Sequence, residues 1–167
     1  YSGPASLPDV VPSSIEKDLT RRDFTINAMA ISLSAQRWGE LVDPSNGFGD
    51  IMRKRIKVLH ESSFIDDPTR LFRAVRYAIR LGFNIDYRTN QLITNALGNV
   101  DLLSGARVRN EFEHILMEPK VSEILRQLEE LGLLSAITPG LRVGSKSLEI
   151  IDALLQADSK THEIEDL

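Results

Sequence analysis

Residues 66–83, "DDPTRLFRAVRYAIRLGF", limit the possible folds of this chain more than any other segment. Their apolar residues recur every three or four positions, which is the period of one helical face. They are Leu71, Ala74, Val75, Ala78 and Leu81. Asp67 suits the N-cap of a helix, Pro68 its first position and Gly82 its end. The segment therefore predicts a helix over 68–81 that buries one face.

The same helix carries a stripe of arginines, at spacings of three, three and four: Arg70, Arg73, Arg76 and Arg80. The stripe could contact phosphates, or its own acids could partly bury it against the fold. The net charge of −4 argues against a domain coated in basic charge for nucleic acid. A local basic face remains open, because attraction depends on how charge is distributed.

Turn residues and periodicity divide the rest of the chain into short elements. Further helices are expected over 87–97, 105–117, 122–131 and 145–156. Earlier segments predict an extended lead-in over 1–14, a short helix or strand over 26–33, a hairpin over 29–43 and a dense turn over 43–50. The fold class is thus mainly α, with a small α/β edge up to about residue 60 and a helical body after it.

Composition excludes several classes of protein. No cysteine is present, which rules out disulfides and thiolate metal sites and fits a reducing cytoplasm. No apolar run reaches the ~18 residues that a membrane span needs, so no membrane partner is expected. The three histidines, His60, His114 and His162, do not have metal-ligand spacing.

Asp67 and Arg70 allow two interpretations. The simpler one is an N-cap with a local salt bridge from Asp66 or Asp67 to Arg70. The functional one is a planar edge, because an aspartate only accepts hydrogen bonds and an arginine only donates them in a fixed fork. Such an edge could read the Watson–Crick face of cytosine or adenine, both of which carry an exocyclic amine. Spacing alone favours the salt bridge.

The segment "DLTRRDFTINAMAIS" raises a similar choice. Arg21, Arg22 and Asp23 could be a solvated charge cluster at the start of a helix. Asn27, inside an apolar run, would need hydrogen-bond partners if it were buried. A site that contacts ribose and phosphate would account for both features, and spacing does not decide between them.

Four segments resemble, in order and spacing, motifs of the class II tRNA nucleotidyltransferase and bacterial poly(A) polymerase family. They are "DLTRRDFTINAMAIS", "LVDPSNGFGD", "FIDDPTRLFRAVRYAIRLGF" and "SGARVRNEFEHILMEP". The resemblance covers roughly residues 10–140. It implies that 1–60 is the C-terminal part of a nucleotidyltransferase head and 61–140 a helical neck with the start of a body. Residues 141–167 would be a further helical segment of the body.

The resemblance also implies roles for individual residues. Asp67 and Arg70 would form the amino-acid template that selects CTP and ATP, with Asp66 standing where the family commonly has Glu. Arg21, Arg22, Asp23 and Asn27 would lie beside the ribose and phosphates of the nucleotide.

The resemblance implies roles for two more groups of residues. Arg107, Arg109 and Glu111 would brace its helix, and Ala106 replaces an acid often found there. The turn residues Asp43, Pro44, Gly47 and Asp50 would form a loop and hinge.

The implied reaction is attack of a tRNA 3′-hydroxyl on the α-phosphorus of a nucleoside triphosphate. It needs Mg²⁺ held by a DxD carboxylate pair, which the family places upstream of the segment around Arg21. This sequence contains no DxD, and Glu163 and Glu165 lie in a polar tail. The lead-in looks like the cut edge of a longer protein. We therefore expect no catalytic or metal-binding residue here, and no activity from this polypeptide alone.

Several alternatives stay open. The same motifs occur in CCA-adding, CC-adding, A-adding and poly(A)-adding enzymes, and they carry no information on oligomeric state. The expected partners are tRNA and nucleoside triphosphates. The competing interpretation is a non-enzymatic RNA-binding or scaffold module that uses the arginine stripe on phosphates; such binding would weaken steeply with salt.

Overall fold

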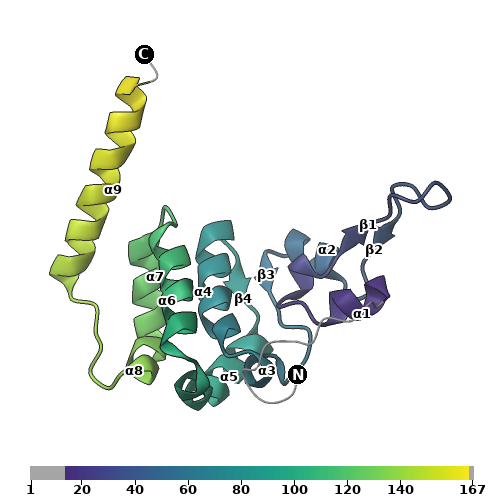
Figure 1. Ribbon diagram of the computed structural model, residues 1–167, viewed down its shortest axis with the longest axis horizontal. Coiled ribbons are helices and arrows are strands. Elements are labelled where there is room, and N and C mark those ends of the chain that lie inside the picture. Colours follow the sequence, from purple (N-terminus) through teal and green to yellow (C-terminus); the bar gives the residue numbers. More distant parts are fainter. Residues whose placement is uncertain (1–13, 166–167) are drawn as a thin grey trace.

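The computed structural model describes residues 14–165, and side chains to residue 155. This part of the chain is mainly helical, as predicted, with two small two-stranded sheets (Figure 1). Its elements are, in order, α1 (Ile15–Thr20), η1 (Thr25–Asn27), β1 (Ala30–Ile31), β2 (Leu41–Val42), α2 (Gly47–Met52), β3 (Arg55–Ile56), α3 (Ser63–Asp66), α4 (Thr69–Leu81), β4 (Asn84–Ile85), α5 (Tyr87–Ala96), η2 (Leu97–Leu102), α6 (Gly105–Leu116), α7 (Val121–Glu130), α8 (Leu133–Ile137) and α9 (Ser145–Glu165). The predicted lead-in lies outside the described residues, except for Ser14.

Helix α4 confirms the prediction for 68–81 within one residue. Gly82 ends it in the left-handed conformation, with φ of 63°. The predicted N-cap is wrong by one position, because Pro68 occupies the cap and Asp67 is extended with φ of −142°. An extended residue before proline avoids a clash with the proline ring. Asp67 still accepts a hydrogen bond from the Thr69 backbone N–H at 3.1 Å.

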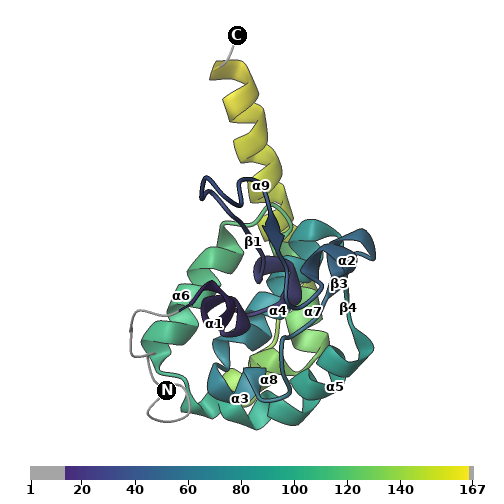
Figure 2. The same ribbon diagram turned by 90° about the vertical axis from the view of Figure 1, so that its right-hand side faces the viewer.

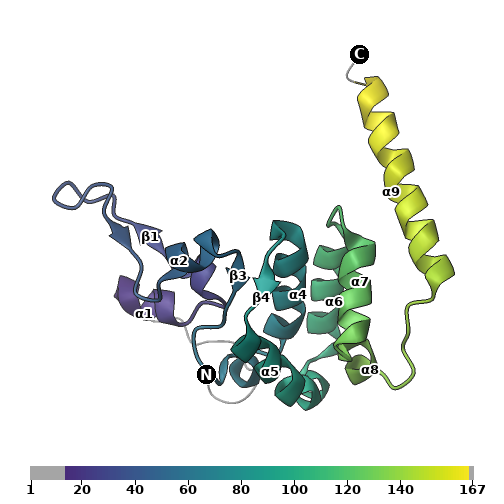
Figure 3. The ribbon, with the colours of Figure 1, turned by 180° about the vertical axis from the view of Figure 1, so that it is seen from behind.

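The core forms where α4 packs against α6 and α7, which stand beside it in Figures 1 and 3. Most of the apolar face of α4 is buried, and Leu71, Phe72 and Val75 are fully covered, whereas Leu81 at its end is 46% exposed. Burial of each such side chain contributes roughly 1.5–3 kcal/mol. One cluster of buried side chains runs from Phe24 to Leu148. The division into segments 1–60, 61–140 and 141–167 stays a prediction.

The other predicted helices are present as α5, α6, α7 and α9. The first three match within two residues, whereas α9 continues to Glu165 instead of ending at 156. Helix α9 projects away from the rest of the chain in Figures 1 and 2. Its buried Leu148 contacts the start of α7, where the Ser122 hydroxyl donates to the Leu148 carbonyl at 3.4 Å. No helix in the described range is both long and apolar enough to cross a membrane.

The predicted hairpin is confirmed by the antiparallel pair β1–β2, which is only two residues long. The predicted turn over 43–50 is partly wrong, because helix α2 starts inside it at Gly47. The reason is a side-chain cap: the Asp43 carboxylate accepts from the Gly47 N–H at 2.7 Å and the Phe48 N–H at 3.0 Å. A Cβ on Gly47 would lie 2.1 Å from the Thr25 carbonyl oxygen, so only glycine allows this approach.

A second sheet, in which β3 and β4 pair in parallel through Arg55 and Asn84, was not predicted. Two residues are too few for a visible alternation of apolar and polar side chains. Helix α4 lies in the connection between these strands, and both lie beside it in Figure 3. The segment before α4 is therefore fixed to the helical part by backbone pairing as well as by packing.

Candidate nucleotide-binding site

Arg70 is the most buried charged side chain of the predicted site. Its side chain is only 3% exposed, and three oxygens accept hydrogen bonds from its guanidinium. Nε donates to Asp23 Oδ1 at 3.1 Å, and one terminal nitrogen donates to the Arg21 carbonyl at 2.8 Å. The other terminal nitrogen donates to the Ser63 carbonyl at 3.4 Å. Arg70 therefore fixes the segment around Arg21 to α4.

Asp23 connects two arginines of α4. Its second oxygen lies 2.8 Å from an Arg73 terminal nitrogen, so one carboxylate bridges Arg70 and Arg73 across 47 residues of sequence. Burial acts against the charge on Arg73, but Asp23 and other nearby groups outweigh it and raise the pKa of Arg73. Asp23 of "RRDFT" thus lies beside an apolar segment because it neutralises the buried Arg70 and the partly exposed Arg73.

Asp67 faces a different group of residues. Its Oδ1 accepts from the Thr69 hydroxyl at 2.6 Å and from an Arg107 terminal nitrogen at 2.7 Å. Among the described residues, none donates to Oδ2. Asp67 lines a pocket of about 330 Å³, here called the Asp67 pocket, together with Thr69, Arg73, Ala106, Arg107, Asn110 and Glu111. An acceptor oxygen is therefore available at the edge of this pocket.

Asp67 and Arg70 do not form one continuous edge in this structure. Arg70 faces Asp23 and does not line the Asp67 pocket, whereas Asp67 faces Arg107. The local salt bridge of the simpler interpretation is absent, because no ion pair joins Arg70 to Asp66 or Asp67 in the described part of the chain. Asp66 Oδ2 lies 3.9 Å from His60 Nδ1.

Glu111 is buried in the wall of the Asp67 pocket, with an Oε2 that has no hydrogen-bond partner within residues 14–155. Burial raises the pKa of Glu111, and the nearby charges of Arg73 and Arg76 only partly offset it. Arg107 and Arg109, which were predicted to brace the template helix together with Glu111, differ in position. Arg107 contacts Asp67, whereas Arg109 is exposed and pairs with Glu113 on its own helix.

The remaining predicted residues lie on the surface before α4. Arg21 and Arg22 are both exposed, and both pair with Asp18. Asn27 is exposed, and its Oδ1 accepts a hydrogen bond from the Phe24 N–H at 2.9 Å. The contact is local because η1 turns the chain back on itself.

Two turn residues have structural contacts. Asp43 caps α2, and Asp50 is buried, where it accepts from the Thr25 hydroxyl at 2.8 Å and from Arg55 at 2.6 Å. Pro44 is not buried. No group of three His, Cys, Asp or Glu residues with metal-ligand geometry occurs among the described side chains, which do not include those of Glu163 and Glu165.

Sequence reasoning missed the part played by Arg73. It belongs to the predicted arginine stripe, but nothing in its spacing separates it from the other members. Its contact with Asp23 depends on how a segment 50 residues earlier folds back onto α4. The sequence held one signal of this contact, a stripe of arginines on a helix that also buries an apolar face. Partly buried arginines need acidic partners from elsewhere in the chain.

Two family models match the chain in consecutive order. Residues 3–57 match the poly A polymerase head domain, and residues 82–143 match the probable RNA and SrmB-binding site of polymerase A. The segment between them is covered by a relative from Geobacter sulfurreducens, an A-adding tRNA nucleotidyltransferase, at 44% identity over 154 residues. The chain belongs to the tRNA nucleotidyltransferase and poly(A) polymerase family.

Other members of the family support this assignment. The Geobacter match covers 91% of this chain and 18% of the relative. A CC-adding tRNA nucleotidyltransferase of Synechocystis is 35% identical over 122 residues, which are 73% of this chain and 29% of that protein. The chain therefore spans well under half the length of these curated relatives.

Solved structures of the family have the same fold. A CCA-adding enzyme in an apo form superposes with a TM-score of 0.87 at 38% identity, over 98% of this chain and 39% of that one. A tRNA nucleotidyltransferase complexed with a primer tRNA and an incoming ATP analog gives a TM-score of 0.82 at 38% identity, over 95% and 47% of the two chains.

Proposed function

We propose that this chain is part of an enzyme that adds nucleotides to the 3′ end of tRNA. The relatives and solved structures described above are named for that activity. The observation that carries the proposal is the Asp67 pocket: an available carboxylate oxygen at the start of a rigid helix, beside a volume of about 330 Å³. Pockets for small ligands start at roughly 300 Å³.

We further propose that Asp67 and Arg70 select the incoming base. Asp67 Oδ2 would accept from the exocyclic amine of cytosine or adenine, and Arg70 would donate to a ring nitrogen or carbonyl. A guanidinium has five N–H groups, and Arg70 uses three of them on protein oxygens. Because Arg70 is buried under Asp23, base contact requires the segment around Asp23 or the Arg70 side chain to move.

The other predicted residues have supporting roles in this proposal. Arg107 would orient Asp67 through their 2.7 Å contact. Glu111 and Arg109, on the same helix as Arg107, and Asp66, just before α4, would support this arrangement. Arg21, Arg22, Asp23 and Asn27 would lie beside the ribose and phosphates of the nucleotide.

The proposed chemistry needs Mg²⁺, and the described side chains contain no group of three or more His, Cys, Asp or Glu residues that could hold a metal ion. We therefore assign no step of the reaction to these residues beyond binding and orientation of CTP, ATP and tRNA. The 167 residues alone are proposed to be inactive, and the complete protein to work in the cytoplasm. The division into head, neck and body segments is part of the same proposal.

Nucleotide selection by the full-length protein tests the template. Arg70→Lys keeps a positive charge beside Asp23 but removes the planar fork. A hydrogen bond to a charged group is worth about 1.5–3 kcal/mol, so preference for CTP and ATP over UTP and GTP should fall roughly 10- to 150-fold. The control is Arg53→Lys at the exposed end of α2. Unchanged selectivity in Arg70→Lys would count against the template. A full-length protein without any transferase activity would favour the non-enzymatic alternative.

A further inference from the structure

Arg73 lies between two carboxylates that come from different parts of the chain. One of its terminal nitrogens is 2.8 Å from Asp23 Oδ2, and Arg73 lines the Asp67 pocket together with Glu111 of α6. The charges of Asp23 and Glu111 both act on Arg73. The Arg73 side chain is 30% exposed, whereas that of Arg70 is 3% exposed. Arg73 is therefore less enclosed than Arg70 and has a second carboxylate beside it.

Glu111 is a carboxylate without a donor. It is 6% exposed, and its Oε2 accepts no hydrogen bond from any of the described residues. A ligand in solution cannot reach an oxygen that the fold covers, so its donor must come from the protein. A buried acceptor without a donor is costly, and native structures keep few of them. Glu111 therefore indicates a second arrangement of its neighbours, in which a donor reaches this oxygen.

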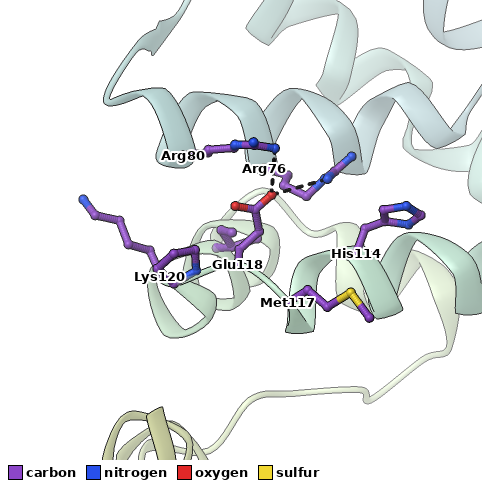
Figure 4. Close-up of a pocket in the computed structure, with 8 residues that line it drawn as sticks. Arg76, Arg80, His114, Met117, Glu118 and Lys120 are labelled. Carbon is purple, nitrogen blue, oxygen red and sulfur yellow. Dashed lines mark hydrogen bonds and ion pairs between the residues drawn. The ribbon is translucent and has the colours of Figure 1, made fainter. Parts of the chain in front are cut away.

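Arg76 is the competing donor, because its charge also acts on Glu111 and its Nε has no hydrogen-bond partner within the described residues. Its side chain is only 9% exposed, and one terminal nitrogen donates to Glu118 Oε1 at 3.3 Å. Figure 4 shows the Glu118 carboxylate reaching α4 between Arg76 and Arg80. Glu118 thus holds Arg76 in place, and Arg73 is the donor that can change partner.

Nucleotide binding changes the surroundings of Asp23. In the proposed function Arg70 turns from Asp23 toward the base, and Asp23 lies beside the ribose. One carboxylate makes both arginine contacts, at 3.1 Å to Arg70 and 2.8 Å to Arg73, so a shift of Asp23 loosens both. Arg70 then gains the base as a partner. Arg73 would be left as an unpaired, partly buried charge, which is unfavourable.

We propose that Arg73 is a further positioning residue of the nucleotide site, which exchanges Asp23 for Glu111 when the nucleotide binds. This inference rests on the proposed function and adds to it a partner for Arg73 in the bound state. The exchange frees the Asp23 carboxylate for the ribose hydroxyls. It also gives the covered oxygen of Glu111 its donor, so binding leaves no buried cation unpaired.

The exchange moves a proton. Burial raises the pKa of Glu111 in the free protein, and the nearby charge of Asp67 adds to this effect. The charges of Arg73, Arg76 and His114 offset it in part. An arginine in contact with Glu111 stabilises the carboxylate, so the Glu111 O–H bond breaks and the proton passes to the solvent. Between the Glu111 pKa of the bound protein and that of the free protein, nucleotide affinity should therefore rise with pH.

Calorimetric titration of the full-length protein with CTP, in the absence of tRNA, tests the exchange. Titrations at one pH in two buffers of different ionisation enthalpy give the number of protons released. The parent protein should release up to about one proton more than Glu111→Gln. The matched control is Glu113→Gln, an exposed carboxylate on the same helix, which should release as many protons as the parent. His114 and the triphosphate titrate in all three proteins, so the difference belongs to Glu111.

A mutant cycle tests whether Arg73 is the donor. Arg73→Gln and Glu111→Gln should each weaken CTP binding roughly 5- to 10-fold, the difference between a charged and a neutral hydrogen bond. The double variant should lose little more than either, because both changes remove one contact. Coupling of the same pair in urea unfolding without nucleotide should be smaller, whereas a merely structural contact would couple equally in both assays. The proton count needs only Glu111→Gln, so it stands even if Arg73→Gln does not fold.

Three results would overturn the inference. The first is equal proton release by the parent and Glu111→Gln. The second is a double variant whose losses multiply, which would mean that Arg73 contacts the triphosphate directly. The third is coupling of Glu111 to Arg76→Lys in place of Arg73→Gln. Failure of the base template appears instead as unchanged selectivity in Arg70→Lys, a measurement that does not depend on proton release.

Discussion

Replacement of Asp23 by asparagine probes the contact that fixes the segment before α4 to the helix. Asp23 is 12% exposed and neutralises Arg70, which is 3% exposed. Removal of one partner from a buried ion pair costs about 3–5 kcal/mol, because the other charge is left uncompensated. In Asp23→Asn the side-chain amide oxygen can still accept from Arg70 Nε, and two backbone carbonyls remain bonded to Arg70. These retained contacts reduce the cost, so we expect a loss of about 2–3 kcal/mol in the free energy of unfolding.

The assay is urea and thermal unfolding of the full-length protein, followed by circular dichroism. In a cooperative unit of 150–250 residues each kcal/mol lowers Tm by roughly 2–4 °C, so the transition of the unit that contains Asp23 should shift down by about 4–12 °C in Asp23→Asn. The matched control is Glu40→Gln, which breaks a solvated pair with Arg37 and should leave Tm unchanged. Arg70→Met and the double variant complete a cycle that isolates the pairwise energy.

Two results would contradict this expectation. One is an unfolding free energy of Asp23→Asn within about 0.5 kcal/mol of the parent value, the range of ordinary surface substitutions. The other is a coupling energy of zero between Asp23 and Arg70, which would mean that the contact at 3.1 Å contributes nothing of its own.

Packing, titration and sequence each lead to one more prediction. Gly47→Ala should cost about 1–3 kcal/mol in urea unfolding because its Cβ would lie 2.1 Å from the Thr25 carbonyl oxygen, whereas Gly105→Ala, with nothing within 4 Å, should cost nothing. The raised pKa of Glu111 means that the folded protein holds this proton more tightly than the unfolded chain, so stability falls as pH rises from 4.5 through the folded-state pKa. Glu111→Gln should remove that fall, and an unchanged pH profile of unfolding would contradict it. The 167 residues alone should incorporate no nucleotide into tRNA with Mg²⁺, and incorporation by pure material would show that a metal site has been overlooked.

Periodicity was enough to predict helices α4 to α7, but not the short helices α1, α2, α3 and α8. Helices α4 to α7 each combine a regular apolar face with a glycine, proline or capping residue at an end, and these signals act within a few residues. Strands β3 and β4 carry no such signal because each is two residues long. Helix α9 was predicted too short. The sequence has no proline or glycine after 156, so it contains no signal that ends the helix there.

The site shows a different limit of sequence reasoning. The residues themselves were named, but the partners of Asp67 and Arg70 were not. Asp23 reaches Arg70 across 47 residues and Arg107 reaches Asp67 across 40, and such contacts depend on tertiary packing. Charge complementarity in the sequence cannot choose among many acids and arginines, so the separate surroundings of Asp67 and Arg70 appeared only in the structure.

A crystal structure of the full-length protein with bound CTP would show whether Asp67 and Arg70 read the base. We predict the cytosine amine within about 3.2 Å of Asp67 Oδ2 and the Arg70 guanidinium turned from Asp23 toward the base. A base bound elsewhere, with Arg70 still on Asp23 and the Arg21 carbonyl, would contradict the template.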